Sequence, residues 1–161
     1  MQIVTGDLLE AKEKYLCHQT NCVTNRSKHL AKSVFIRFPY ADIYSARSTP
    51  SIPGSIIIRG DEQEQRFVIG MLGQYYPGKK YSSSKKDGKA ARISYFTSCL
   101  EKMKSLKGDF AFPWRIGCGA AGGDWDLYLE QIEKFADIIA GEVRIYKLPQ
   151  PEKKPEFKTL F

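Results

Sequence analysis

Four glycines crowd into seven residues at 117–123, and this cluster restricts the fold more than any other feature. The apolar stretch 109–113 predicts a buried strand before it, and an amphipathic helix is predicted from residue 126. Glycines at such a turn allow positive φ angles and direct backbone N–H groups around an anion, to which the helix N-terminus adds partial charge. The cluster therefore predicts a phosphate or pyrophosphate ligand. The alternative is a tight turn in which Asp124 only caps the helix.

Strand-like and helix-like patterns alternate along most of the chain. Leu30, Val34 and Phe38 recur at spacings of four in a helix that Pro39 ends. Such alternation predicts an α/β fold, with a mostly parallel sheet covered by helices on both faces. Strands are predicted over residues 2–5, 15–20, 55–59, 66–72, 109–113 and 143–148, with the third and fourth as a hairpin. Helices are predicted over 29–38, 41–47, 90–106 and 126–139, with a helical turn or two within 8–14.

The bulk properties indicate a single globular domain. A length of 161 residues suits one domain with a sizeable core. No apolar run approaches the roughly 20 residues that cross a membrane, and no signal peptide pattern opens the chain. A cytoplasmic location, or a nuclear one in a eukaryote, is therefore expected, without disulfides. The four cysteines and two histidines show no zinc spacing, so neither a metal nor a cofactor is expected.

The formal net charge of +7 is unevenly distributed. The segment 79–89, called the lysine loop below, has five lysines and one aspartate, which is +4 of the +7. A Gly/Ser-rich lysine loop is more often a solvated insertion than a binding groove, so nucleic acid is not the favoured partner. The tail 149–161 contains three prolines and several charges, and we expect it to be flexible. The predicted domain spans residues 1–148.

Four motifs, in this order along the chain, resemble those of macro domains, which bind ADP-ribose. They are TGDLL at 5–9, CHQTNC at 17–22, HLAKSVF at 29–35 and PWRIGCGAAGGDW at 113–125. The last is the most specific, and it is similar to the branch that includes ADP-ribose-1″-phosphate phosphatases and terminal ADP-ribose glycohydrolases. The resemblance covers residues 1–148 and implies a three-layer α/β/α sandwich with a mixed, mostly parallel six-stranded sheet.

The resemblance also implies roles for individual positions. Asp7 would accept a hydrogen bond from the adenine amino group, and Leu8 would lie beside the adenine. Asn21 would bind the distal ribose, over which the loop 24–29 would close. The implied ligand contacts are Asp7, Leu8, Asn21, Ser27, Lys28, His29, Leu30, Ile116, Gly117, Cys118, Gly119, Ala120, Ala121 and Gly122, the last seven through backbone that holds the pyrophosphate.

Two departures from the family pattern bear on this site. Ser27, Lys28 and His29 stand where many macro domains have consecutive glycines, so a lysine and a histidine would add charge contacts to the diphosphate.

The branch that removes ADP-ribose from glutamate uses a lysine late in the middle strand and an aspartate soon after Gly-Cys-Gly. Gln74 and Ala121 occupy those positions here, so the lysine-based covalent mechanism is not expected.

Hydrolysis of an ADP-ribose derivative is the function that the resemblance favours. Asp124 and His18 are the catalytic candidates near the distal ribose, and Asn21 would position the substrate. One of the two would activate water to remove a 1″-phosphate or an ester-linked group, while the loop amides stabilise negative charge. The structural alternatives are that Asn21 is a turn residue and that His18 is a buried structural histidine.

Two other functions stay open. A non-catalytic reader of ADP-ribose or of ADP-ribosylated protein would use the same cleft without an acid–base group. An RNA- or poly(ADP-ribose)-binding module would depend on the lysine loop, and its affinity would fall steeply with salt. This module is the least favoured because only Tyr75, Tyr76 and Tyr81 offer stacking surfaces near the lysines.

Overall fold

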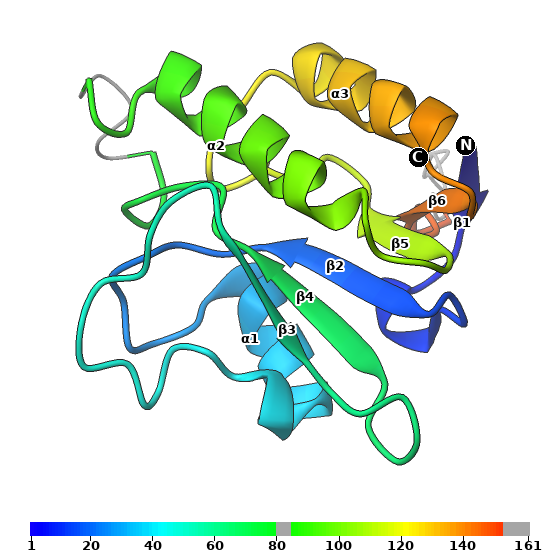
Figure 1. Ribbon diagram of the computed structural model, residues 1–161, viewed down its shortest axis with the longest axis horizontal. Coiled ribbons are helices and arrows are strands. Elements are labelled where there is room, and N and C mark those ends of the chain that lie inside the picture. The colour runs from blue at the N-terminus through cyan, green and yellow to red at the C-terminus, as the bar shows by residue number, and fades with distance from the viewer. Residues whose placement is uncertain (80–84, 153–161) are drawn as a thin grey trace, which may run out of the picture.

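The computed structural model describes residues 1–79 and 85–152, and it contains a six-stranded sheet (Figure 1). The strand order is β1-β6-β5-β2-β4-β3, and every neighbouring pair is parallel except β3 and β4. The mixed, mostly parallel sheet is therefore confirmed. The strands are β1 (Gln2–Thr5), β2 (Tyr15–Gln19), β3 (Ile56–Arg59), β4 (Phe67–Met71), β5 (Phe110–Pro113) and β6 (Val143–Lys147), and the α-helices are α1 (His29–Arg37), α2 (Lys89–Met103) and α3 (Trp125–Ile138).

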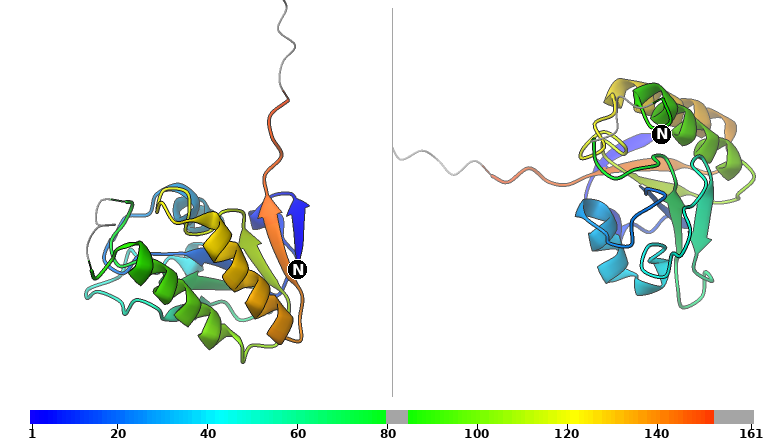
Figure 2. Two further views of the ribbon diagram at one scale, coloured as in Figure 1. Left: turned by 90° about the horizontal axis from the view of Figure 1, so that it is seen from above. Right: turned by 90° about the vertical axis from the view of Figure 1, so that its left-hand side faces the viewer.

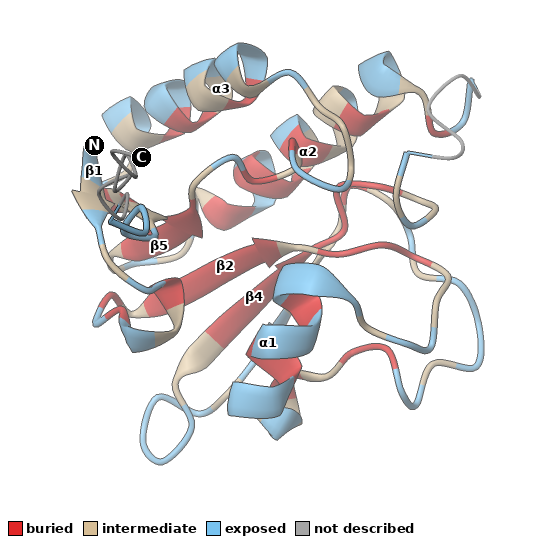
Figure 3. Cartoon of the chain, turned by 180° about the vertical axis from the view of Figure 1, so that it is seen from behind, coloured by how far each residue is buried: buried red, intermediate tan, exposed pale blue. Residues whose placement is uncertain are grey.

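The helices form one layer on each face of the sheet. Helix α1 covers one face, and α2 and α3 lie side by side over the other (Figures 1 and 2). Alternate residues of the central strands enter the two cores: Leu16 of β2 packs on the α1 side, and Cys17 packs on the side of α2 and α3. Because both faces are covered, β2, β4 and β5 are mainly buried (Figure 3).

Two predicted helical segments differ in the structure. Residues 8–14 contain only the 3-10 turn η1 (Leu8–Glu10). The helix predicted over 41–47 is wrong, because the structure has the 3-10 turn η2 (Pro39–Ala41) followed by irregular turns. The Asp42 carboxylate accepts hydrogen bonds from the N–H groups of Tyr44 (2.9 Å) and Ser45 (3.1 Å), and such local bonds compete with a helix.

Parts of two predicted segments lie outside the described residues, namely 80–84 of the lysine loop and 153–161 of the tail. None of the described helices is long and apolar enough to cross a membrane.

The neighbouring strands β2 and β5 place the candidate ligand loops at one edge of the sheet. The chain leaves β2 toward α1 on one face and leaves β5 toward α3 on the other. Adjacent parallel strands whose connections go to opposite faces open a crevice at their carboxyl ends, where α/β proteins usually bind ligands. The glycine cluster after β5 and the segment after β2 therefore meet at this crevice.

Candidate functional site

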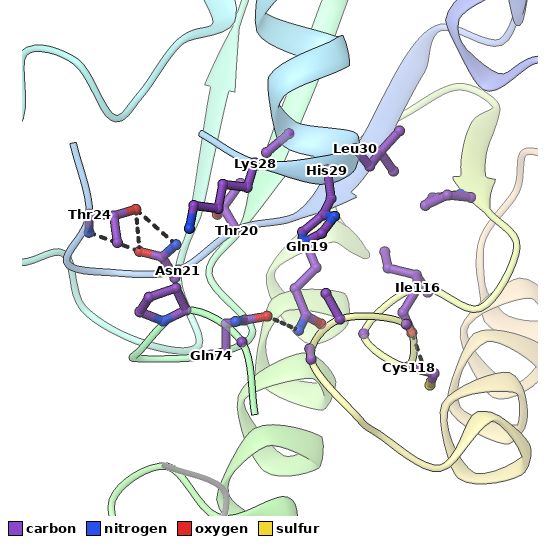
Figure 4. A pocket seen from close by; sticks show the side chains of 18 of the residues that line it. Gln19, Thr20, Asn21, Thr24, Lys28, His29, Leu30, Gln74, Ile116 and Cys118 are labelled. Carbon is purple, nitrogen blue, oxygen red and sulfur yellow. Dashed lines mark hydrogen bonds between the residues drawn. The ribbon is translucent and has the colours of Figure 1, made fainter. Parts of the chain in front are cut away.

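A cleft of about 970 Å³ opens at the carboxyl ends of β2 and β5 (Figure 4). One wall comes from residues within 19–31 together with Tyr44, and the other comes from residues 113–121. Gln74, Pro77 and Gly78 complete the lining. The volume lies within the range of roughly 300–1,000 Å³ that is typical of small-molecule sites.

The glycine loop owes its shape to three residues with positive φ angles. These are Arg115 (57°), Gly117 (73°) and Gly122 (74°). A Cβ atom at Gly117 would lie 2.5 Å from Cε1 of Tyr128 and 2.7 Å from Oε1 of Gln19. Glycine is therefore required at position 117 by the backbone conformation and by the close packing.

Several backbone N–H groups of the same loop have no acceptor in the described part of the chain, and their residues line the cleft. The internal bonds of the loop include those from the Cys118 N–H to the Arg115 carbonyl (2.9 Å) and from the Gly123 N–H to the Gly117 carbonyl (3.0 Å). Within the described residues, the N–H groups of Gly117, Gly119 and Ala120 donate to no acceptor. Neighbouring N–H groups without an acceptor, such as those of Gly119 and Ala120, are suited to bind an anion.

A buried ion pair ties the glycine loop to the opposite rim of the cleft. Arg92 of α2 and Asp87 are almost fully buried, with 2.6 Å between Nη2 and Oδ2. The Arg92 guanidinium also donates to the carbonyl oxygens of Ala121 (3.1 Å) and Gly78 (2.6 Å). Asp87 accepts from the Tyr75 N–H (2.7 Å). The pair thus fixes the segment around Gly78 against the glycine loop.

Asn21 organises the loop that follows β2. Its Oδ1 accepts from the N–H groups of Val23 and Thr24, both at 3.0 Å. Its Nδ2 donates to Oγ1 of Thr24 (3.0 Å) and to the hydroxyl of Tyr44 (3.2 Å). Burial raises the pKa of the Tyr44 hydroxyl to about 12, so this group is neutral near pH 7. The Asn21 side chain is therefore engaged within the loop, although the residue also lines the cleft.

Helix α1 begins in the cleft with a histidine in an unusual conformation. His29 has a φ angle of 54°, a region that costs a non-glycine residue roughly 1–2 kcal/mol. Lys28 is the N-cap residue, and its side chain makes no capping hydrogen bond. Both residues line the cleft together with Leu30, and Figure 4 shows the His29 imidazole extending toward Gln19.

Two glutamines form the floor of the cleft. Gln19 Nε2 donates to Gln74 Oε1 at 2.7 Å, and Gln74 Nε2 donates to the Tyr76 carbonyl at 2.9 Å (Figure 4). Gln19 Oε1 is buried and has no hydrogen-bond partner in the described part of the chain. Gln19 is not among the site residues that the sequence predicts, although its place as the last residue of a central strand is a signal for a ligand site.

The lining is basic. Among the described residues it contains Arg26, Lys28, His29 and Arg115 and no carboxylate. Burial raises the pKa of the Cys118 thiol to about 12, so this group is also uncharged near pH 7. No cluster of three or more metal-binding side chains occurs in residues 1–79 and 85–152. A site with this charge attracts anions.

Solved structures with a similar fold cover nearly the whole chain. The macrodomain of Mycobacterium tuberculosis DarG has a TM-score of 0.71 at 20% identity, and the match covers 92% of this chain and 97% of that one. The macrodomain of Thermus aquaticus DarG has a TM-score of 0.67 at 22% identity, covering 91% and 97%. Thermosipho africanus DarTG in complex with ADP-ribose has a TM-score of 0.67 at 18% identity, covering 96% and 43%.

The chain has the macrodomain fold. Neither a protein-family model nor a curated protein sequence matches it. The likeness is therefore one of structure, and it confirms the fold that the four sequence motifs predict.

The cleft brings together most of the predicted ligand contacts. Asn21, Lys28, His29, Leu30 and residues 116–121 line it. Ser27 and Gly122 do not, and a Cβ atom at Gly122 would lie 3.0 Å from Cδ of Lys79. The positive φ angle of His29 keeps a backbone conformation that glycine adopts readily, in the place where the family pattern has glycine.

Asp7 and Leu8 lie outside the cleft lining. Asp7 Oδ1 accepts from the Leu9 N–H (2.9 Å) and caps η1, and Leu8 is buried in the core on the α1 side. The carboxyl end of β1 is nevertheless at the same edge of the sheet, separated from β5 by β6. With about 4.8 Å between neighbouring strands, the ends of β1 and β5 are roughly 10 Å apart.

The two titratable catalytic candidates do not line the cleft. His18 is 1% exposed, and its ring packs edge-on against Phe35 of α1 with 5.5 Å between ring centres. Its position follows from strand alternation, which turns it to the same face as Leu16. Asp124 is exposed and caps α3 by accepting from the Asp126 N–H at 3.1 Å. These positions do not support direct contact with a ligand in the cleft.

Proposed function

We propose that this macrodomain binds ADP-ribose or an ADP-ribose derivative in the cleft. The observation that carries the proposal is the lining, in which free loop N–H groups and basic side chains occur without a carboxylate. ADP-ribose carries its charge on a diphosphate, which such a lining suits. The structure of Thermosipho africanus DarTG was determined with ADP-ribose, which supports the same ligand class here.

The diphosphate would lie against the backbone of residues 116–121. The distal ribose would lie beneath the loop 24–29. There the Asn21 side chain would give up one of its hydrogen bonds within the loop and form one with a ribose hydroxyl. The adenine would extend along the sheet edge toward β1. Asp7 would accept from the adenine amino group through the carboxylate oxygen that does not cap η1, since a carboxylate has acceptor capacity for both bonds.

A decisive test uses a matched pair of substitutions at Gly119. A Cβ atom there would meet no atom within 4 Å, so a side chain can be added without a clash. Gly119→Asp places a carboxylate beside the proposed diphosphate, whereas Gly119→Asn adds a neutral group of nearly the same shape. We expect calorimetric titration with ADP-ribose to show micromolar binding for the unmodified protein. Gly119→Asp should lose about tenfold or more of this affinity, equivalent to about 1.4 kcal/mol, and Gly119→Asn should lose much less.

AMP and ADP serve as control ligands for the same titration. AMP should bind more weakly than ADP-ribose because it lacks the diphosphate. Absence of ADP-ribose binding, or equal losses for Gly119→Asp and Gly119→Asn, would contradict the proposed placement.

The finer proposal is that the macrodomain hydrolyses an ADP-ribose derivative, either the 1″-phosphate or an ester-linked group. The competing proposal is a reader that binds ADP-ribose or ADP-ribosylated protein without releasing a product. Chromatography of each derivative after incubation with the protein separates the two. Release of ADP-ribose at a rate above the uncatalysed one supports the hydrolase, and saturable binding without product supports the reader.

A further inference from the structure

We propose that His29 is the general base and general acid of the cleft. This inference rests on the proposed function, since it concerns the cleavage of a derivative bound there. It departs from the expectation that His18 and Asp124 supply the acid–base chemistry.

The residues that line the cleft offer few groups that can accept a proton. The described lining contains no Asp or Glu, and Arg26, Lys28 and Arg115 are cations that do not accept a proton. Burial raises the pKa of the Cys118 thiol and of the Tyr44 hydroxyl to about 12 in each case, so neither is a base near pH 7. Histidine is the side chain whose ordinary pKa allows it to accept and release a proton near neutrality. His29 is therefore the acid–base side chain that the described lining offers.

The backbone conformation at His29 also indicates a functional residue. Its φ angle of 54° lies in a region that glycine adopts without conformational strain, yet the residue at this position is a histidine. Non-glycine residues in sparsely populated conformations cluster at functional sites. The imidazole is exposed to the cleft and extends toward the glutamine floor (Figure 4).

The groups that face His29 suit hydrolysis of an anionic substrate. Lys28 precedes it on the same loop, Gln19 lines the cleft beside it, and Arg115 and the loop with the free N–H groups of Gly117, Gly119 and Ala120 form the opposite wall. The cations and N–H groups would hold the substrate anions and stabilise the negative charge that develops at the reacting group. His29 would remain the group that moves the proton.

The proposed step transfers a phosphoryl or acyl group from the 1″ oxygen of the distal ribose to water. The water oxygen forms a bond to phosphorus or to the acyl carbon while the imidazole takes a proton from that water. The bond between this atom and the 1″ oxygen then breaks with its electron pair on oxygen. The imidazolium returns the proton to that oxygen, which yields ADP-ribose with phosphate or a carboxylic acid and regenerates His29.

The test compares His29→Gly and His29→Asn with the unmodified protein. Both residues tolerate a positive φ angle, so the loop conformation should survive. The substrates are ADP-ribose-1″-phosphate and an acetyl ester of ADP-ribose, which distinguish the phosphoryl from the acyl reaction. We expect kcat to fall by about 100-fold or more in both variants, the usual range for loss of acid–base catalysis. ADP-ribose affinity should fall by less than about tenfold, or 1.4 kcal/mol.

Chemical rescue separates a proton-transfer role from a structural one. Free imidazole should restore part of the turnover of His29→Gly, because glycine leaves room beside the substrate, and should not accelerate the unmodified protein. Turnover by His29→Gly close to that of the unmodified protein would overturn the proposal. So would ADP-ribose binding by the unmodified protein without turnover of either substrate, which would leave the proposed binding function intact. Absence of ADP-ribose binding would instead overturn the proposed function together with this inference.

Discussion

The buried imidazole of His18 should make the stability of this protein depend on pH. The ring is 1% exposed, and neither nitrogen has a hydrogen-bond partner in the described part of the chain. Desolvation lowers its pKa in the folded protein from an ordinary value of 6.5 to about 4. His18→Leu removes the titrating group from this apolar site and leaves a side chain of similar size.

The magnitude follows from the two pKa values. Above pH 6.5 the imidazole is neutral in both the folded and the unfolded chain, so its titration costs nothing. Between pH 6.5 and about 4 the His18 imidazole binds a proton in the unfolded chain but not in the folded chain. The free energy of unfolding therefore falls with decreasing pH. Each tenfold difference in proton affinity is worth about 1.4 kcal/mol, so the full loss at pH 4 is about 3 kcal/mol.

Urea unfolding at several pH values between 7.5 and 4 measures this loss. The unmodified protein should lose about 3 kcal/mol more than His18→Leu over that interval, because carboxylate titration is common to both. Parallel stability curves for the unmodified protein and His18→Leu would refute the reasoning, since they would mean that the His18 ring finds solvent or a partner when protonated.

Three further outcomes follow from the loop that forms one wall of the cleft. Arg92→Met leaves Asp87 buried without its partner and should cost about 3–5 kcal/mol in urea unfolding; a smaller loss would mean that water reaches the pair. Gly117→Ala should lower the free energy of unfolding by about 2 kcal/mol or more, because Gly117 has a positive φ angle and an added Cβ would contact Tyr128. Gly119→Ala should change the unfolding midpoint little, and equal effects of the two substitutions would contradict this difference in packing. Cys118 should react with iodoacetamide at pH 8 far more slowly in the folded than in the unfolded chain, because burial raises its thiol pKa to about 12.

Hydrophobic patterns predict the succession of strands and helices except at residues 41–47. The α1 pattern of Leu30, Val34 and Phe38 predicts a helix over 29–38, and the structure has it over His29–Arg37. The failure at 41–47 has a local cause, since Asp42 satisfies two backbone N–H groups with its own side chain. Periodicity records which face of a segment is apolar, but it does not record such competition between a side chain and the helical backbone.

The site was predicted less completely, because its key contacts join residues far apart in the sequence. Arg92 lies in a helix and carries a charge, which in a sequence indicates an exposed position. Its burial depends on carbonyl groups of Gly78 and Ala121, 14 and 29 residues away. The Gln19–Gln74 pair similarly depends on the parallel pairing of β2 with β4. For His18, strand alternation is sufficient to predict burial away from the cleft, because His18 shares a face of β2 with the buried Leu16.

The parallel direction of β1 and β6 has a practical consequence for handling the protein. β1 begins at the edge of the sheet opposite the cleft, whereas β6 ends at the edge on which the cleft opens. An affinity tag or a surface linker attached before Gln2 would therefore anchor the molecule with its cleft facing the solution. One attached after Lys147 would begin at the ligand side. Immobilisation through the N-terminus is consequently the better geometry for measuring ligand capture on a sensor surface.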